Sequence, residues 1–320
     1  MLTVFGSINL DVSVGCAHLP RPGETLLGTD ALLSPGGKGA NQAHAARRFG
    51  VPVRLFGTVG GDAFAGPALA KLADSGVDLS GVAVSGADAT GLATITVNQA
   101  GENAIIVAPG ANLASCASQV PNAVLRASGV LLLQLEVPWP ESLALARRAR
   151  SAGCKVVLNA SPLQQHAALE LDAVDLLIVN GVELGQLCAQ HGIDGSPMQR
   201  ARRLADTQHI DVLVTLGADG SFLMQADGQH IHARALPVQA VDTTGAGDTY
   251  AGVLCAAMAC GEPPEQAMAF ASVAASLACL RAGAQVAQPT RAEIDARIDT
   301  HGGELGQEAG LSLHHDTTTT

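Results

Sequence analysis

The stretch Asp242-Thr243-Thr244-Gly245-Ala246-Gly247-Asp248 runs directly into the apolar segment Thr249-Tyr250-Ala251-Gly252-Val253-Leu254. Two glycines let the backbone turn sharply and point successive N–H groups at one place. The apolar segment predicts a helix, whose first amides and positive dipole end converge on that same place. We therefore expect an anion site with the Asp248 carboxylate beside it as a candidate base, the arrangement that phosphoryl transfer uses. The alternative interpretation is that Asp248 only caps the helix.

Outward from this stretch, apolar runs alternate with helix-like stretches that stop at glycine. This alternation is typical of an α/β fold with a mainly parallel sheet covered on both faces. The predicted strands are Leu2–Phe5, Val53–Gly57, Val130–Leu135, Lys155–Asn159, Asp175–Val179 and Asp211–Leu216. The predicted helices are Ala40–Phe49, Phe64–Ser75, Pro140–Ala152, Glu183–His191 and Val253–Cys260, and Thr290–Glu293 is a capping box that opens a last helix.

Two segments, 12–34 and 90–108, break this alternation and predict a small β-sheet lid inserted into the body. The first carries prolines and glycines without a helical period, and the second alternates like a hairpin with a turn at Asn98–Asn103. The α/β body then comprises residues 1–11, 35–89 and 109–300. Residues 301–320 are rich in glycine, histidine and threonine and are expected to be a disordered tail.

Composition limits the classes of partner and compartment. Hydrophobic residues make up 48% of the 320 residues, which is ample for a core, but aromatic residues supply only 2%. The formal charge is −11 and no run of lysine or arginine exists, so a nucleic-acid partner is not expected. The seven cysteines include no C-x-x-C pair. No leader is visible at the start of the sequence, and no apolar run approaches the length of a membrane span. We expect a cytoplasmic protein that does not bind membranes.

Polar residues near the first strand suggest a polyol site. A predicted strand over Gly6–Val14 places Asn9 and Asp11 on one face, where an amide and a carboxylate could bind adjacent hydroxyls. The loop Gly36-Gly37-Lys38-Gly39-Ala40-Asn41-Gln42-Ala43 allows close backbone approach and offers Lys38 and Asn41 as donors. The alternatives are a solvated strand face and an ordinary glycine-rich turn.

Asn180 and Glu183 follow a predicted buried strand and open a helix. Carboxyl ends of parallel strands gather ligands, so this pair could organise a hydrated magnesium ion or simply cap the helix. His230 and His232 share a strand face, but no third metal ligand is evident beside them. The chain has neither G-x-x-x-x-G-K-[ST] nor G-x-G-x-x-G, which argues against a P-loop enzyme and a nicotinamide dehydrogenase.

Taken together and in this order, these motifs resemble those of the ribokinase-like (PfkB) carbohydrate kinases over roughly residues 1–296. Gly36-Gly37-x-Gly39-x-Asn41-x-Ala43 with Gly50 and Gly60 matches the family's first signature, and Asp242–Gly252 matches its second. Leu133-Gln134-Leu135-Glu136 and Arg281-Ala282-Gly283-Ala284-Gln285 resemble the ribose-phosphorylating members most closely. The resemblance implies a three-layer sandwich with a β-sheet lid, and a homodimer formed through that lid.

The resemblance also implies an activity: ATP-dependent phosphorylation of D-ribose at its 5-hydroxyl, with Mg²⁺ accompanying ATP and K⁺ as activator. The resemblance implies that Asp248 is the base and that residues around it bind the sugar, ATP and the two cations. The anion hole would comprise Gly245, Ala246, Gly247 and Asp248, and the sugar would meet Asn9, Asp11, Gly37, Lys38, Gly39, Ala40, Asn41, Glu136 and Asp248. ATP would meet Asn180, Thr215, Leu216, Gly217, Ala218, Asp219, Gly220, Gly247, Asp248 and Ser272. Potassium would be held by Asp242, Thr244, Ala278, Arg281, Gly283 and Ala287, mostly through carbonyls, and magnesium by Glu183 through water.

The sequence departs from the family pattern at two places, and other functions stay open. Gly181-Val182 stands where these kinases more often have Glu-Thr, and Ser272 falls where a histidine often faces adenine. A kinase for another furanose or for a nucleoside is the nearest alternative. A metabolite-binding protein without catalysis is a further one, against which the intact Asp248 and its glycines argue.

Overall fold

The computed structural model describes residues 1–163 and 169–305, and its main element is a large β-sheet. Within the described residues this sheet has nine strands, of which β12 and β13 are antiparallel to their neighbours and the rest pair in parallel. In spatial order the strands are β13 (His230–Ala233), β12 (Ser221–Met224), β11 (Asp211–Thr215), β10 (Leu176–Asn180), β9 (Lys155–Asn159), β8 (Val130–Leu133), β1 (Leu2–Phe5), β4 (Val53–Gly60) and β5 (Asp78–Ser85).

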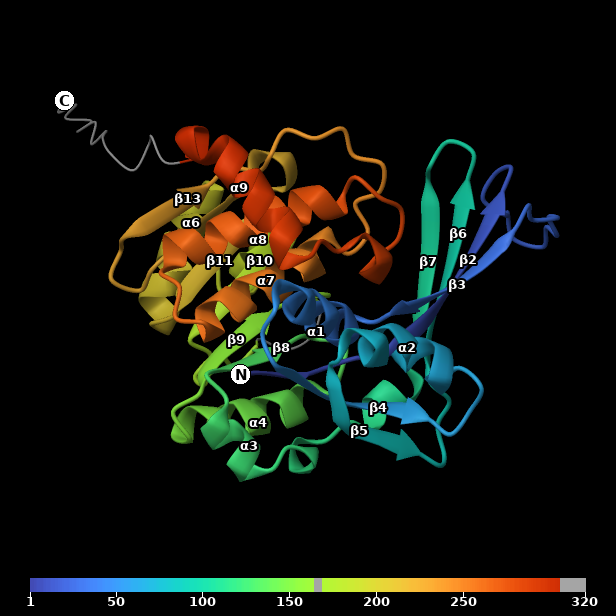
Figure 1. The fold of residues 1–320 in the computed structure, drawn as a ribbon, viewed down its shortest axis with the longest axis horizontal. Helices are drawn as coiled ribbons and strands as arrows, with labels where there is room; N and C mark the ends of the chain where they lie inside the picture. The colour runs from blue at the N-terminus through green and yellow to red at the C-terminus, as the bar shows by residue number, and fades with distance from the viewer. Residues whose placement is uncertain (164–168, 306–320) are drawn as a thin grey trace.

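Helices cover both faces of this sheet (Figure 1). On one face pack α1 (Lys38–Phe49), α2 (Ala65–Ser75), α7 (Ala246–Ala259) and α8 (Pro264–Ala278), followed by α9 (Arg291–Leu305). On the other face pack α3 (Asn122–Ala127), α4 (Trp139–Ser151), α5 (Gly181–Gln190) and α6 (Pro197–Gln208).

The two cores follow from the period of two along each buried strand. In β8, Leu132 packs into the core beneath α1 and α7, whereas Leu131 and Leu133 pack into the core beneath α4 and α5. Because both faces are covered, the strands are apolar at every position instead of alternating. The arrangement is the three-layer α/β sandwich with a mainly parallel sheet that the sequence predicts.

A second, smaller sheet stands out from one side of the body, next to α2 (Figure 1). Its strand order is β3 (Ala31–Gly36), β2 (Asn9–Cys16), β6 (Gly91–Asn98) and β7 (Asn103–Ala108). The turn between β6 and β7 lies where the sequence predicts it, because Asn98 Oδ1 accepts hydrogen bonds from the amides of Ala100 and Glu102. The division of 12–34 and 90–108 into a separate lid domain stays a prediction.

The predicted glycine stops lie at or next to the observed helix ends. Each of these glycines has a positive φ, a conformation that costs glycine little and that ends a helix in the left-handed region. They are Gly50, Gly76, Gly153, Gly192 and Gly261.

Most element boundaries differ from the sequence expectation by one to three residues, and two differences are larger. The predicted strand over Gly6–Val14 is broken, since β1 ends at Phe5 and β2 begins at Asn9. At Gly6 a Cβ would meet the Gln134 side chain at 1.8 Å and the Gly39 backbone at 2.9 Å, so the chain leaves the sheet at a crowded crossing. The helix predicted from Val253 begins at Ala246 instead, because the small residues at 246–252 join the first turns.

The C-terminal helix begins at the predicted capping box. Glu293 Oε2 accepts from the Thr290 amide, and Thr290 Oγ1 accepts from the Glu293 amide. The helix α9 extends to Leu305, and the remainder of the predicted tail, 306–320, lies outside the described residues.

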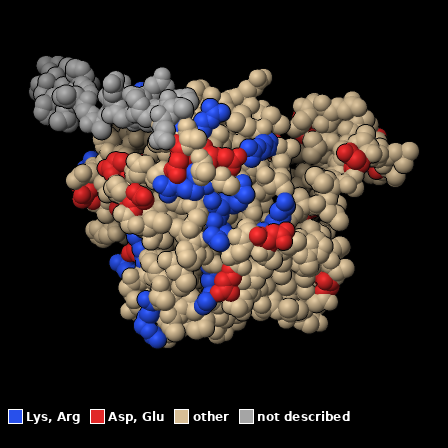
Figure 2. All heavy atoms as spheres, viewed as in Figure 1, with Lys and Arg blue, Asp and Glu red and all other residues tan. Residues whose placement is uncertain are grey.

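The surface charges, the cysteines and the length of the helices complete the description of the fold. Figure 2 shows acidic and basic side chains interspersed on the viewed face of the body, and few charged groups on the small sheet. The cysteines are all unpaired thiols. Within 1–163 and 169–305, no helix is long and apolar enough to cross a membrane.

Candidate active site

Several of the polar residues singled out in the sequence lie near one another at the carboxyl edge of the large sheet. Chain segments leave this edge after β1, β8, β9, β10 and β11, and the N-termini of α1 and α7 point toward the same edge. Ligands gather at such an edge because the strand ends and helix N-termini present open backbone groups there. Figure 1 shows α1 and α7 side by side, and the two helices pack against each other although they are about 200 residues apart in the sequence.

Asp248 lies in the first turn of α7 and is 7% exposed. Its Oδ2 accepts a hydrogen bond from Asn41 Nδ2 at 3.0 Å, and its Oδ1 accepts one from Gln42 Nε2 at 2.9 Å. Each carboxylate oxygen therefore has one neutral amide donor from α1. This arrangement fixes the plane of the carboxylate while leaving its remaining lone pairs available for a proton.

Lys38 opens α1 and interacts electrostatically with three carboxylates. Although burial favours the neutral amine, the charges of Asp248, Glu136 and Glu183 raise the pKa of Lys38. The side chain therefore carries a positive charge at neutral pH, within the electrostatic reach of all three carboxylates. A cation at this place would attract the phosphate of a nucleotide or neutralise charge during its transfer.

Glu136 connects the end of β8 to the start of α1. Its Oε2 accepts from Ser7 Oγ at 2.5 Å and from the Lys38 amide at 3.0 Å. Ser7 Oγ in turn accepts from the Gly39 amide at 3.3 Å. The carboxylate thus orders the glycine-rich loop that the sequence singles out.

Asp11 and Asn9 lie on β2, where the small sheet joins the body. Burial, together with the charges of Glu136 and Asp248, raises the pKa of Asp11 from 3.8 to about 6. Asn9 is 3% exposed, and its Oδ1 accepts from Asn112 Nδ2 at 2.7 Å. The structure places both residues near Glu136, whose charge acts on Asp11 and which lines a cavity together with Asn9.

The turn before α7 has the form that an anion site requires. Gly245, at the helix N-cap, has φ 73°, and a Cβ on Gly245 would meet Ala284 at 3.0 Å. The Ala246 amide donates to the Thr243 carbonyl at 3.2 Å, which closes the turn. A Cβ built on Gly247 meets nothing within 4 Å, so space stands open above this backbone. An anionic group could approach the helix N-terminus there.

The predicted nucleotide loop follows β11. Thr215 is the register neighbour of Asn180 on β10, so the two candidate residues lie side by side at the sheet edge. The loop closes where the Leu216 amide donates to the Gly220 carbonyl at 2.8 Å. The short 3₁₀ turn Gly217–Asp219, which includes Ala218, lies within it.

Asn180 and Glu183 form a reciprocal cap at the start of α5. Asn180 Oδ1 accepts from the Glu183 amide at 2.8 Å, and Glu183 Oε2 accepts from the Asn180 amide at 2.9 Å. Capping is thus one role of this pair. Ser272 is buried and donates through Oγ to the Arg234 carbonyl at 2.7 Å, so its hydroxyl is occupied by the protein itself.

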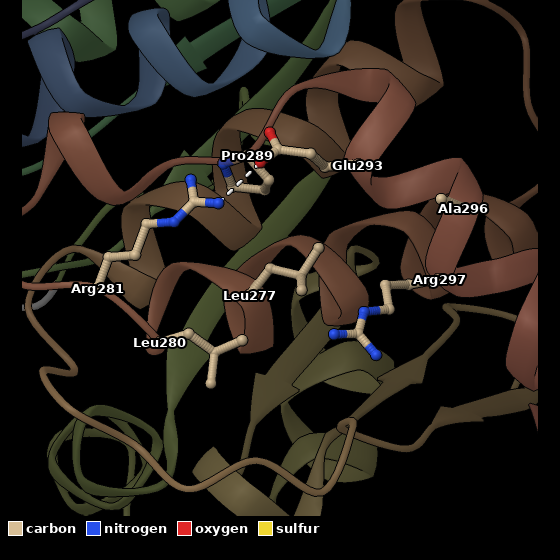
Figure 3. Close-up of a pocket in the computed structure, with 7 residues that line it drawn as sticks. All are labelled: Leu277, Leu280, Arg281, Pro289, Glu293, Ala296 and Arg297. Carbon is tan, nitrogen blue, oxygen red and sulfur yellow. Dashed lines mark hydrogen bonds and ion pairs between the residues drawn. The ribbon is translucent and has the colours of Figure 1, made fainter.

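The residues proposed for a monovalent cation lie on the loop before α7, at the end of α8 and on the segment that follows α8. Asp242 Oδ1 accepts from the Thr244 amide and Asp242 Oδ2 from the Gly283 amide. The Ala278 carbonyl accepts from the Arg281 amide at 3.4 Å, and Ala287 lies in the 3₁₀ turn that follows. Figure 3 shows the Arg281 side chain directed toward Glu293, its partner at 2.8 Å, beside a cavity of about 400 Å³ between α8 and α9.

A larger cavity of about 630 Å³ opens next to Asn9 and Glu136. Most of its wall is apolar, with Val107 from β7, Leu113, and Trp139 at the start of α4. Neither Asp248 nor Lys38 lines this cavity. It therefore opens on the part of the site that Asn9 and Glu136 form.

Sequence reasoning missed the role of several buried amides around Asp248. Gln42 Nε2 also donates to Asn159 Oδ1 at 3.0 Å, and Gln134 Nε2 donates to Gln42 Oε1 at 2.6 Å. Gln285 Nε2 donates to Asn41 Oδ1 at 3.1 Å. The one available signal was position, because Gln134 and Asn159 end or follow apolar runs at the same sheet edge.

The comparisons with known proteins agree with this geometry. A model of the pfkB family of carbohydrate kinases matches residues 1–291, and the chain therefore belongs to that family. It is a phosphotransferase that acts on a sugar hydroxyl.

Similar proteins are ribokinases. A ribokinase from Haemophilus influenzae is 35% identical over 295 residues, covering 91% of this chain and 96% of that protein. A crystal structure of a ribokinase from Thermotoga maritima has a TM-score of 0.87 at 30% identity and covers 93% of this chain and 99% of that one. A ribokinase from Arabidopsis thaliana, complexed with ribose and ATP, has a TM-score of 0.83 at 32% identity, with coverages of 92% and 97%.

Proposed function

We propose that this kinase transfers the γ-phosphoryl group of ATP to the 5-hydroxyl of D-ribose, giving D-ribose 5-phosphate and ADP. The observation that carries the proposal is the buried Asp248 carboxylate at the N-terminus of α7, beside the open backbone at Gly247. The similarity to ribokinases, one of them complexed with ribose and ATP, supports ribose as acceptor.

Ribose would bind between β2 and the start of α1. Asn9, Asp11 and Glu136 offer acceptors for its hydroxyls, and Lys38 and Asn41 offer donors. Gly37 and Gly39 let the start of α1 pack directly on the backbone of residues 6–9, where a Cβ on either glycine would come within 3.0 Å of that backbone. Asn9 and Asp11 lie two positions apart on β2 and could bind adjacent hydroxyls, which would favour a sugar that has its 2-hydroxyl.

In the reaction, Asp248 accepts the proton of the 5-hydroxyl while that oxygen forms a bond to the γ-phosphorus. The bond between the γ-phosphorus and the bridging oxygen breaks, and the leaving group is ADP. The amides of Gly245, Gly247 and Asp248, at the positive end of α7, stabilise the negative charge on the transferring phosphoryl oxygens, whereas the Ala246 amide closes the turn. Lys38 adds a positive charge close to the same place.

Magnesium and potassium fit the donor atoms that the chain offers. Magnesium prefers oxygen ligands and keeps several of its waters, so the phosphate oxygens of ATP would supply part of its coordination. Glu183 would contact the magnesium hydration shell, and the ion would supply charge neutralisation on the phosphates. The loops of Asp242 and Gly283 would hold potassium through carboxylate and carbonyl oxygens.

The apolar cavity beside Asn9 and Glu136 favours a second candidate acceptor, a nucleoside. Its volume and its Trp139 and Leu113 walls suit a flat base attached to the sugar at the end away from Asp248. Trp139 is the single tryptophan of the chain, so its fluorescence is a direct probe of binding at this wall.

The small sheet could close over the sugar and also join a second copy of the chain. Its outer strands expose Leu32 and Ile106 at 63% and 73%, with Leu33 and Ile105 beside them. Closure would exclude water, which otherwise competes as the phosphoryl acceptor.

The test is ADP release from Mg-ATP with D-ribose, deoxyribose, fructose, inosine and adenosine, each with potassium or sodium. We expect ribose-dependent turnover, and Asp248→Asn should lower it by at least ~10²–10⁴-fold. Asp74→Asn, an exposed change on α2, is the matched control. Turnover with another acceptor alone would overturn the ribose assignment, and near-normal turnover of Asp248→Asn would overturn the base.

A further inference from the structure

We propose that Gln42 is a positioning residue that holds Asp248 in its productive orientation without touching the sugar or ATP. The inference rests on the proposed role of Asp248 as the base. Gln42 is fully buried, and its Nε2 donates to Asp248 Oδ1 at 2.9 Å. Its position on α1 directs the side chain toward the protein interior, between α7 and the ends of β8 and β9.

The orientation of the Gln42 amide is set by its neighbours. Its Nε2 must face Asp248, because the carboxylate oxygen can only accept, and its Oε1 then accepts from Gln134 Nε2 at 2.6 Å. The same Nε2 donates to Asn159 Oδ1 at 3.0 Å. Asn159 Nδ2 is itself engaged with the Ile178 carbonyl at 3.3 Å. A flipped Gln42 would place its carbonyl oxygen against two acceptors.

This chain of amides connects Asp248 to the rigid part of the fold. Gln134 follows β8, Asn159 ends β9 and Ile178 lies in β10, so three neighbouring strands determine where Gln42 points. Side chains on a packed sheet edge move little, and the orientation they impose is transmitted to the carboxylate.

Asn41 supplies the second half of the clamp, but its role differs. It donates to Asp248 Oδ2 at 3.0 Å and belongs to the residues proposed to meet the sugar. Consecutive residues on a helix point about 100° apart, so the two amides reach the carboxylate from different sides. With Gln42 removed, Asp248 would keep one donor and could rotate about its Cβ–Cγ bond, toward Lys38 among other partners.

The consequence is a loss of kcat with little change in KM. Misplacing a reacting group by about 1 Å can cost ~10²-fold in rate. Gln42→Met keeps the volume and removes the donors, and we expect it to lower kcat ~10–100-fold while the KM for ribose changes by less than ~3-fold. Gln42→Glu keeps the shape but places a carboxylate against Asp248, and it should lower kcat at least as much.

A double-mutant cycle tests whether Gln42 acts through Asp248. If it does, Gln42→Met adds no further loss to Asp248→Asn, because the group it positions is already gone. Gln199→Met, which removes the exposed hydrogen bond from the Ser196 amide at the start of α6, is the control and should leave kcat unchanged. Thermal unfolding of every variant separates loss of fold from loss of alignment.

The outcomes separate the two proposals. Near-normal kcat of Gln42→Met, or additive losses in the double mutant, would overturn the positioning role while an inactive Asp248→Asn keeps the base. Near-normal turnover of Asp248→Asn would instead overturn the proposed function on which this inference rests.

Discussion

The Gly283 amide donates a hydrogen bond to Asp242 Oδ2 at 2.8 Å, joining the loop before α7 to the loop after α8. The other oxygen of Asp242 accepts from the Thr244 amide at 2.9 Å. These hydrogen bonds lower the pKa of Asp242 despite its partial burial, which by itself would raise it. The carboxylate therefore stays charged where two loops meet, three residues before the turn proposed to bind phosphate.

We predict that Asp242→Asn removes most of the activation by potassium. The asparagine has only one acceptor oxygen, so one of the two backbone bonds is lost together with the negative charge. Turnover measured with potassium and with sodium should become nearly equal, and the potassium-supported rate should fall about tenfold or more. Asp206→Asn, on the exposed side of α6, is the control. A variant that keeps its full potassium response would contradict the cation site.

Asp11 gives a prediction about pH and stability. Its pKa is raised to about 6, so the folded chain binds more protons than the unfolded chain between about pH 4 and pH 6. Stability contributed by this group therefore falls as pH rises through that window. Asp11→Asn should raise the free energy of unfolding at pH 7.5, by at most about 3 kcal/mol, relative to the wild type.

The same substitution should weaken ribose binding, because the amide accepts fewer hydroxyl hydrogens than a carboxylate. We expect a KM for ribose at least about tenfold higher, and in the wild type a KM that rises as pH falls below 6. Denaturant unfolding at pH 4 and pH 7.5, with Asp194→Asn as control, measures the predicted change in the free energy of unfolding. Equal stability of Asp11→Asn and wild type at both pH values would refute it.

The order of strands and helices and the candidate base could be predicted from the sequence because their signals are local. Apolar runs define the buried strands, glycines with positive φ end the helices, and Gly245 and Gly247 open α7. The start of α7 was predicted seven residues too late, at Val253 instead of Ala246. Its first turns contain small and polar residues, and the helix is fixed there by packing on α1 instead of by an amphipathic pattern.

The amide network could not be predicted, since its signals are non-local. Gln42 lies in a helix pattern where a glutamine is ordinarily expected to face water. It is buried only because α7 closes on α1, and its partners Gln134 and Asn159 come from strand ends about one hundred residues away in the sequence. The crowding at Gly6 is also non-local, since a Cβ there would meet Gln134 and Gly39.

The spacing between α1 and α7 depends on Gly252. A Cβ at this position would lie 2.4 Å from the Gln42 carbonyl oxygen, which belongs to backbone and has little freedom to move. Gly252→Ala should therefore displace α7 from α1, destabilise the chain by about 1–3 kcal/mol and lower kcat through Asp248. Gly66→Ala in α2, where a Cβ meets nothing within 4 Å, is the matched control.

Alanine at position 66 should leave kcat unchanged and leave stability equal or up to about 1 kcal/mol higher, because alanine favours the helix. Thermal unfolding and ribose-dependent ADP release of both variants make the comparison. If Gly252→Ala behaved like Gly66→Ala, the close contact of the two helices would have no influence on the site.

The last prediction concerns Asn112, which orients Asn9. Asn112 is 1% exposed, its Nδ2 donates to Asn9 Oδ1 at 2.7 Å and its Oδ1 accepts from the Ile8 amide at 2.8 Å. Asn112→Ala should cost about 1–3 kcal/mol of stability, because it leaves buried groups unpaired. It should also raise the KM for ribose about tenfold with little change in kcat, since Asn9 lies away from the candidate base.

Asn112→Asp separates these two effects. The aspartate keeps an acceptor for the Ile8 amide but loses the donor to Asn9, so ribose binding should weaken even where the fold is retained. Trp139 fluorescence, titrated with ribose, reports binding directly, and Asn122→Ala at the surface is the control. Because Asn112 would act only by orienting Asn9, the double variant with Asn9→Ala should bind ribose no more weakly than Asn9→Ala alone. A further loss of affinity in that double variant would mean that Asn112 contributes to the sugar site by a separate route.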